Sequence, residues 1–276
     1  MRSAFTMALA SRSAGKMAAA LSTKAPREIT TLIFDIDDTL YPVSSRFSDH
    51  RNGAIVADFM VDTLGFASHE LALQVRDEYF KKYHSTLKGL SVATAEGKLP
   101  KPFQQHMLGE YWAEHCEFAK FLPPNLALAK QLKSLRDDAG LRLVVFTNAP
   151  RLYGLRCLES LAVREYFKDE DIFAVEDVMP ACKPEAAAFE TVLKAVGADA
   201  DECVMFEDSM KNIRVCGSLG MRTVFIDEGA GTNGGTKSGE AALLGDVATA
   251  ADDVGHVLER IEQLQDRIPQ LWQRQL

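Results

Sequence analysis

The sequence lacks the features that mark membrane, nucleic-acid-binding and disulfide-rich proteins. No apolar run approaches the roughly 20 residues that a membrane-spanning helix needs. A net charge of -8 with no block of Lys and Arg argues against a surface for nucleic-acid phosphates. The five cysteines are odd in number and widely spaced, with no C-x-x-C pair and no zinc-like His spacing. We therefore expect a soluble protein of a reducing compartment that binds neither membranes nor nucleic acids.

Acidic residues are also missing from the start of the chain, where Glu28 is the first acid. The preceding segment carries basic residues among Ala and Ser: Arg2, Arg12, Lys16, Lys24 and Arg27. This composition is typical of an organelle transit peptide, and a disordered tail or a mis-called start codon explains it equally well. We expect residues 1–28 to lie outside the fold and the protein to be intracellular, in the cytoplasm or in an organelle.

Short, β-rich apolar runs alternate with helical patterns from Thr30 onward. Such alternation predicts βαβ units and a parallel sheet. The predicted strands are 30–36, 141–148, 171–175, 202–208 and 222–227, and the predicted helices are 125–138, 152–162, 184–197 and 209–220. The fold class that follows is α/β, with a Rossmann-like doubly wound parallel sheet.

One interval breaks this alternation. Between Pro42 and Pro124 the apolar residues recur at helical spacing and no strand is predicted. We expect an all-helical cap, residues 44–122, inserted after the first strand into a core made of residues 29–43 and 123–276. The two prolines at 123 and 124 are the expected return hinge.

The last part of the chain holds a glycine-rich stretch, 229–239, and an apolar pattern in 252–276. The glycine-rich stretch lacks the Gly-Lys-Ser/Thr ending of a P-loop, so we predict a flexible connection. The later pattern predicts one helix with an apolar face, interrupted by Pro269. Packing of this face on the core is the expectation, with a dimer contact as the alternative; the oligomeric state stays open.

Ligands of parallel sheets bind beyond the carboxyl ends of the strands. The polar residues at those ends are Asp35, Asp37, Asp38, Thr147, Asn148, Glu207 and Asp208, with Lys183 in the loop before a helix. Two like charges about 4 Å apart repel by roughly 4 kcal/mol at an effective dielectric near 20, so clustered acids need a positive partner. Asp35 and Asp208 offer the hard oxygen ligands that Mg²⁺ prefers, and Lys183 supplies a second positive charge.

These residues form motifs that resemble those of the haloacid dehalogenase superfamily of phosphatases. The motifs occur in order as "DIDDT", "FTN", "KP" and "FEDSMKN", and the resemblance spans residues 30–227. It implies that Asp35 is a nucleophile that forms an aspartyl-phosphate and that Asp37 is the general acid and base. It also implies that Thr147, Asn148 and Lys183 hold the transferring phosphoryl group.

The same resemblance implies a Mg²⁺ cofactor. Its expected ligands are Asp35, the backbone carbonyl of Asp37, and Asp208, with Glu207 acting directly or through water. Complete motifs argue against a non-catalytic regulatory protein, which remains an alternative. Asp37 argues against a hydrolytic dehalogenase, which needs no acid to protonate a halide.

Two further residues of the first motif receive structural predictions. Asp38 is expected to cap a helix or to be solvated. Thr39 is expected to fix the turn through hydrogen bonds that orient Asp37.

Within the superfamily, "FDIDDTLYP" and "YFKKYHSTLKGL" are most similar to the pyrimidine 5'-nucleotidases. This resemblance implies a role in nucleotide metabolism, with UMP or CMP as the small phosphorylated substrate. Lys88, His106 and Tyr111 are the cap residues expected to select the base, and Arg46 and Arg151 are weaker candidates for phosphate or ribose contact. A phosphatase or phosphomutase for another small metabolite remains the alternative.

Overall fold

The structure is a computed structural model that describes residues 27–229 and 255–273. Residues 1–26 of the predicted leader, and nearly all of the glycine-rich stretch 229–239, lie outside the described residues. Within the described ranges, no helix is both long enough and apolar enough to cross a bilayer.

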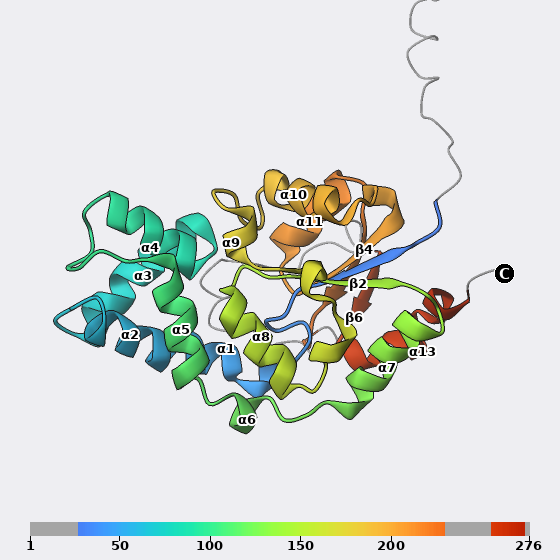
Figure 1. Ribbon diagram of the computed structural model, residues 1–276, viewed down its shortest axis with the longest axis horizontal. Helices are drawn as coiled ribbons and strands as arrows, with labels where there is room; N and C mark the ends of the chain where they lie inside the picture. The colour runs from blue at the N-terminus through green and yellow to red at the C-terminus, as the bar shows by residue number, and fades with distance from the viewer. Residues whose placement is uncertain (1–26, 230–254, 274–276) are drawn as a thin grey trace, which may run out of the picture.

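Six parallel strands form one sheet in the order β3-β2-β1-β4-β5-β6 (Figure 1). Their bounds are β1 Thr31–Phe34, β2 Arg142–Phe146, β3 Ile172–Phe173, β4 Cys203–Glu207, β5 Arg222–Ile226 and β6 His256–Leu258. The chain leaves the middle of the sheet in both directions, which confirms the doubly wound α/β fold. β1 lies between β2 and β4, with Phe34 paired to Val145 on one side and to Phe206 on the other.

Helices cover both faces of the sheet, because alternate residues of each strand point to opposite faces. Leu32 and Phe34 of β1 share a core with α7 (Leu126–Asp137) and α8 (Arg151–Ser160), whereas Ile33 shares the other core with α10 (Ala186–Val196) and α11 (Met210–Ser218). In Figure 1, α10 and α11 lie above the sheet and α7 and α8 below it. The remaining short elements are η3 Arg164–Tyr166, η4 Asp169–Asp171, α9 Val175–Val178 and η5 Ala200–Glu202.

Between β1 and α7 every described element of secondary structure is a helix. We call these elements the helical insertion: η1 Val43–Ser45, α1 Phe47–His50, the π-helical turn η2 Arg51–Ile55, α2 Val56–Asp62, α3 His69–Tyr83, α4 Thr86–Ala95, α5 Gln105–His115 and α6 Phe118–Phe121. The side chains of Ser68 and Ser85 accept hydrogen bonds from the first turns of α3 and α4, which fixes where these helices begin. Helices α2 to α5 lie together at one end of the molecule, at the left of Figure 1. The bounds 44–122 and the closing of this unit over a substrate stay predictions.

The end of the chain differs from the prediction of one interrupted helix. Residues His256–Leu258 form the edge strand β6, followed by η6 Ile261–Gln263, α13 Leu264–Arg267 and η7 Pro269–Trp272. β6 lies close to β5: a Cβ added at Gly255 would be 2.8 Å from the carbonyl oxygen of Thr223. The expected packing on the core is confirmed, since Ile261, Leu264 and Ile268 are buried in it.

Candidate active site

The ends of β1 and β4 bring three carboxylates together. Because Phe34 and Phe206 pair in register, Asp35 follows β1 beside the end of β4, and its backbone N–H donates to the Phe206 carbonyl at 3.0 Å. Asp35, Glu207 and Asp208 each place a carboxylate oxygen within 4.8 Å of the others. The strand-end acids that lie far apart in the sequence therefore form one cluster.

Lys183 neutralises part of this cluster from the loop before α10. Its Nζ atom lies 2.7 Å from Oδ1 of Asp35 and 2.7 Å from Oε2 of Glu207, and it also donates to the Phe146 carbonyl at 3.0 Å. The side chain is only 2% exposed. Burial alone would lower the pKa of Lys183, but the two carboxylates outweigh burial and raise it. Lys183 is therefore a fixed positive charge against the proposed nucleophile.

The charge of one lysine does not balance three acids, of which Asp35 and Glu207 are buried and Asp208 is partly buried. Burial raises the pKa of Asp35 well above its ordinary value despite Lys183, and neighbouring Glu207 and Asp37 raise it further. The pKa of Asp208 is also raised, first by burial and then by the charges around it. Hard carboxylate oxygens at this spacing, with charge still to be compensated, fit a divalent cation such as Mg²⁺. Asp35 and Asp208 would hold it, beside Glu207.

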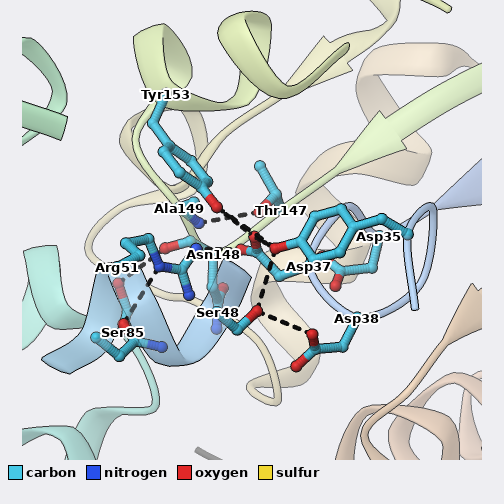
Figure 2. A network of polar contacts seen from close by, with 12 residues as sticks. Asp35, Asp37, Asp38, Ser48, Arg51, Ser85, Thr147, Asn148, Ala149 and Tyr153 are labelled. Atoms are coloured by element: carbon cyan, nitrogen blue, oxygen red, sulfur yellow. Dashed lines mark hydrogen bonds and ion pairs between the residues drawn. The ribbon is translucent and has the colours of Figure 1, made fainter. Parts of the chain in front are cut away.

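Asp37 is held by a second network, which reaches into the helical insertion (Figure 2). Its Oδ1 atom accepts hydrogen bonds from Tyr41 at 2.5 Å and from Tyr153 at 2.7 Å, and its Oδ2 atom is 2.6 Å from Nη1 of Arg51. Burial would raise the pKa of Asp37, but the Arg51 charge and the three donated bonds lower it overall. In this arrangement Asp37 is a fixed, charged carboxylate.

Thr147 and Asn148 follow β2 and hold backbone in place. Oγ1 of Thr147 accepts from the backbone N–H of Ala149 at 3.0 Å. The Asn148 side chain accepts from the Lys183 N–H at 2.9 Å and donates to the carbonyls of Lys183 at 2.8 Å and His84 at 3.0 Å. Asn148 thus ties the Lys183 loop to the turn between α3 and α4. The predicted phosphate contacts of Thr147 and Asn148 stay predictions.

The structural prediction for Asp38 is wrong, and the prediction for Thr39 is confirmed only for its backbone N–H, which donates to the Ile36 carbonyl within the turn at 3.3 Å. Asp38 is 4% exposed, has a φ of 57°, and accepts from Oγ of Ser48 at 2.9 Å, so it is neither solvated nor the cap of a described helix. Oγ1 of Thr39 is buried and has no hydrogen-bond partner among the described residues. Asp37 is instead oriented by Tyr41 at the end of this turn and by Arg51 and Tyr153 from outside it.

The cap residues predicted to select a base do not line the cavity beside Asp37. Lys88 forms an ion pair with Glu185 of the core, His106 is exposed, and the Tyr111 hydroxyl donates to a carboxylate on α2. Lys88 therefore links the insertion to the core. The roles of all three in base selection stay predictions.

The two arginines suggested for phosphate or ribose contact have partners elsewhere. Arg46 pairs with Asp49 at 2.9 Å, in the adjoining helix. Arg151 pairs with Asp177 at 2.6 Å and donates to the Ile172 carbonyl at 2.6 Å. Both side chains stabilise local backbone in this structure.

A small cavity of about 30 Å³ lies between the helical insertion and the core. We call it the Arg51 cavity. Residues from both units line it: Asp37, Arg51, Phe80, His84, Ser85, Thr86, Leu87, Trp112, Asn148, Ala149 and Pro150. Asp37, the candidate general acid, therefore lies between the strand-end acids and a pocket whose walls come largely from the insertion.

Comparison with known families identifies the family of the chain. The family model described as haloacid dehalogenase-like hydrolase matches residues 29–220. The chain belongs to this family.

Several proteins that are similar to this haloacid dehalogenase-like hydrolase are phosphatases by name. Pyrophosphatase PpaX of Halalkalibacterium halodurans is 22% identical over 200 residues, which cover 72% of this chain and 84% of that protein. A phosphoglycolate phosphatase of Neisseria gonorrhoeae is 26% identical over 208 residues, or 74% of this chain and 82% of that protein. The solved structure of CbbY from Rhodobacter sphaeroides in complex with phosphate covers 86% of this chain and 96% of that chain, with a TM-score of 0.54 and 16% identity. At that identity the likeness shows the fold alone.

The sequence motifs of this haloacid dehalogenase-like hydrolase located its acids and lysine but missed the residues around Asp37. Arg51, Tyr41 and Tyr153 come from η2, the turn after β1 and α8. Tyr41 stands in the quoted "LYP", four residues after Asp37, which was the one available signal. Arg51 and Tyr153 carry no motif, and only the folded chain brings them to the carboxylate.

Proposed function

We propose that the protein is a Mg²⁺-dependent phosphomonoester hydrolase that acts through an aspartyl-phosphate on Asp35. One observation carries the proposal: Nζ of Lys183 lies 2.7 Å from both Asp35 and Glu207, in a cluster that Asp208 completes. A binding protein gains nothing from burying these charges together, because each costs free energy to remove from water. A nucleophile with a compensating lysine and room for a cation does need them.

In the first step, a carboxylate oxygen of Asp35 attacks phosphorus, and the bond to the ester oxygen breaks. Lys183 fixes Oδ1 of Asp35 at 2.7 Å, which leaves the other oxygen for attack, and its charge stabilises the negative charge of the transition state. A bound Mg²⁺ would neutralise further negative charge on the phosphoryl group. Asp37 gives a proton to the departing ester oxygen.

In the second step, a water molecule attacks phosphorus of the aspartyl-phosphate and releases inorganic phosphate and the free Asp35 carboxylate. Asp37 takes a proton from this water. The contacts with Arg51, Tyr41 and Tyr153 favour the charged carboxylate of Asp37, which is the form that acts as base. The acid form needed in the first step requires a weaker interaction with Arg51.

For the natural substrate, we propose a small phosphorylated metabolite. The resemblance of the "LYP" and cap segments to pyrimidine 5'-nucleotidases supports UMP and CMP, and with them a role in nucleotide metabolism. A second candidate is a hydrolase of smaller phosphorylated acids. It is supported by the size of the Arg51 cavity and by relatives named phosphoglycolate phosphatase and ribulose-1,5-bisphosphate 5-phosphatase. In either case, we propose that the helical insertion closes over the site as a cap.

The test is release of inorganic phosphate from a panel of phosphorylated metabolites with Mg²⁺ and with a chelator. Asp35→Asn should abolish release, because the amide is not a nucleophile, and the folded state should be preserved. Asp38→Asn is the matched control, since it removes a neighbouring buried charge that we place outside the reaction. Turnover by Asp35→Asn, or full activity in the presence of the chelator, would contradict the proposal.

A further inference from the structure

The Arg51 cavity contains a positive charge held in a fixed position. The Arg51 side chain is 4% exposed, and its guanidinium carbon lies 5.0 Å from the Trp112 ring centroid and 4.9 Å from that of Tyr153. Nη1 also contacts Asp37 at 2.6 Å, and Nε donates to Oδ1 of Asn52 at 3.2 Å. A guanidinium between two aromatic rings keeps its plane, so its edge is presented in a defined direction. Such an edge matches the planar oxygens of a carboxylate or phosphate.

Trp112 provides a second donor on the same wall. The residue is 2% exposed, and its Nε1–H group has no hydrogen-bond partner among the described residues. A buried N–H without an acceptor is unfavourable, and native proteins retain few of them. Trp112 lines the cavity beside Arg51, and an acceptor in the cavity that reaches Nε1 would satisfy this group.

The beginning of α4 adds to the positive character of the cavity. This ten-residue helix starts after Ser85, and its first two residues, Thr86 and Leu87, line the cavity. The first turn of a helix carries a partial positive charge from its backbone N–H groups. The acid in the wall, Asp37, is already engaged by Arg51 and two tyrosine hydroxyls, so its charge is compensated.

The size of the cavity limits what it can hold. A volume of about 30 Å³ takes about two water molecules, since each needs roughly 10–15 Å³ measured in this way. A carboxylate group is of this size. The walls offer donors from Arg51, Trp112 and a helix N-terminus.

We propose that the Arg51 cavity is the subsite for a carboxylate on the non-transferring part of the substrate. Resting on the proposed phosphatase function, this assigns the substrate to the class of small phosphorylated carboxylic acids. Arg51 and Trp112 then determine specificity, through an anion that sits beside Asp37 while the phosphoryl group sits at Asp35.

The test compares two esters that differ at one group. In 2-phosphoglycolate the carbon next to the ester methylene is a carboxylate, and in ethyl phosphate it is a methyl group. We expect the wild-type protein with Mg²⁺ to show a kcat/KM about ten- to one-hundredfold higher for 2-phosphoglycolate, as charge-assisted hydrogen bonds allow. Arg51→Lys and Trp112→Phe should each reduce this ratio about tenfold, mainly by weakening the binding of the carboxylate-bearing ester, which raises its KM. Trp272→Phe, at the only other tryptophan, should leave the ratio unchanged because that indole donates to Ser134 far from the cavity.

Each other outcome has a distinct meaning. Equal kcat/KM values for the two esters in the wild type, or a preference for UMP over 2-phosphoglycolate, would overturn the subsite while the phosphatase function stands. Equal losses on both esters in Arg51→Lys and Trp112→Phe would overturn it as well, since these residues would then only position Asp37. Absence of phosphate release from every ester, p-nitrophenyl phosphate included, would mean that the phosphatase function itself has failed.

Discussion

Lys183→Met tests whether the buried lysine holds the strand-end acids together. The substitution keeps the length of the side chain and removes its charge. At an effective dielectric near 20, each 2.7 Å contact is worth about 6 kcal/mol before the cost of burying the charges is subtracted. Breaking a buried pair by removing one partner typically costs about 3–5 kcal/mol, because the remaining charge stays buried without its partner. We expect a loss of that size in the free energy of unfolding at pH 8, measured by urea denaturation with a chelator present.

The loss in the free energy of unfolding should depend on pH through the ionisation of the acids beside Lys183. The folded-state pKa of Lys183 is raised, so its stabilising contribution is fully present below its unfolded pKa of about 10.4 and is lost only as pH rises through the folded value. Lys183 is therefore charged in both states between pH 5 and pH 8. The pKa of Asp35 is also raised, so its charge destabilises the fold as pH rises above about 3.9. Lys183→Met raises that pKa further.

The difference in stability between the wild type and Lys183→Met should therefore be larger at pH 8 than at pH 5. A matched substitution at an exposed lysine, Lys120→Met, should show neither the loss nor its pH dependence, since Lys120 lies on the surface. An equal difference at both pH values, or no destabilisation, would refute the assignment of Lys183 as the charge that stabilises the cluster.

Two further predictions address the Asp37 network and the sheet edge. Tyr153→Phe removes a hydrogen bond that lowers the pKa of Asp37, so this pKa should rise. The alkaline limb of the kcat/KM profile, where the acid form of Asp37 is lost, should then move to higher pH. A limb that does not move would exclude Asp37 as the acid. Gly255→Ala should destabilise the fold by about 1–3 kcal/mol in thermal or urea unfolding, because the new Cβ would lie 2.8 Å from the Thr223 carbonyl oxygen. Unchanged stability would mean that β6 does not lie this close to β5.

The sequence predicted the central part of the fold well because local pattern and tertiary environment agree there. Strands β1, β2 and β4 are buried on both faces and therefore read as continuous apolar runs ending in polar residues. β6 was missed for the opposite reason. It has three residues, and only Leu258 is buried, so its pattern merges with the apolar residues that follow at helical spacing. Pairing with β5, which no local pattern records, makes His256–Leu258 a strand.

The same distinction applies to the site. The sequence alone could predict that residues at strand ends lie close together, because the geometry of a parallel sheet places all carboxyl ends along one edge. Asp35 and Asp208 lie far apart in the sequence and still followed from this rule, whereas Lys183 came from the family motif. The position of Arg51 could not be predicted in this way. Which side chain a helix of the insertion presents to the core depends on how the whole insertion packs. The position of Arg51 is nonetheless strongly determined by two aromatic rings and Asp37.

The contact between Arg51 and Asp37 joins the helical insertion to the edge of the sheet where we propose the active site. Arg51 belongs to η2, so any movement of the insertion that opens the cavity also changes the distance between its guanidinium and the Asp37 carboxylate. Ser85 and His84 make the corresponding contacts with Asn148, and Asn148 in turn holds the Lys183 backbone. A substrate that enters between the two units would therefore contact residues that are linked to both Asp37 and Lys183. For this reason we expect substitutions at Arg51 to alter both substrate selection and the position of Asp37, the proposed general acid. Comparing 2-phosphoglycolate with ethyl phosphate separates these two effects.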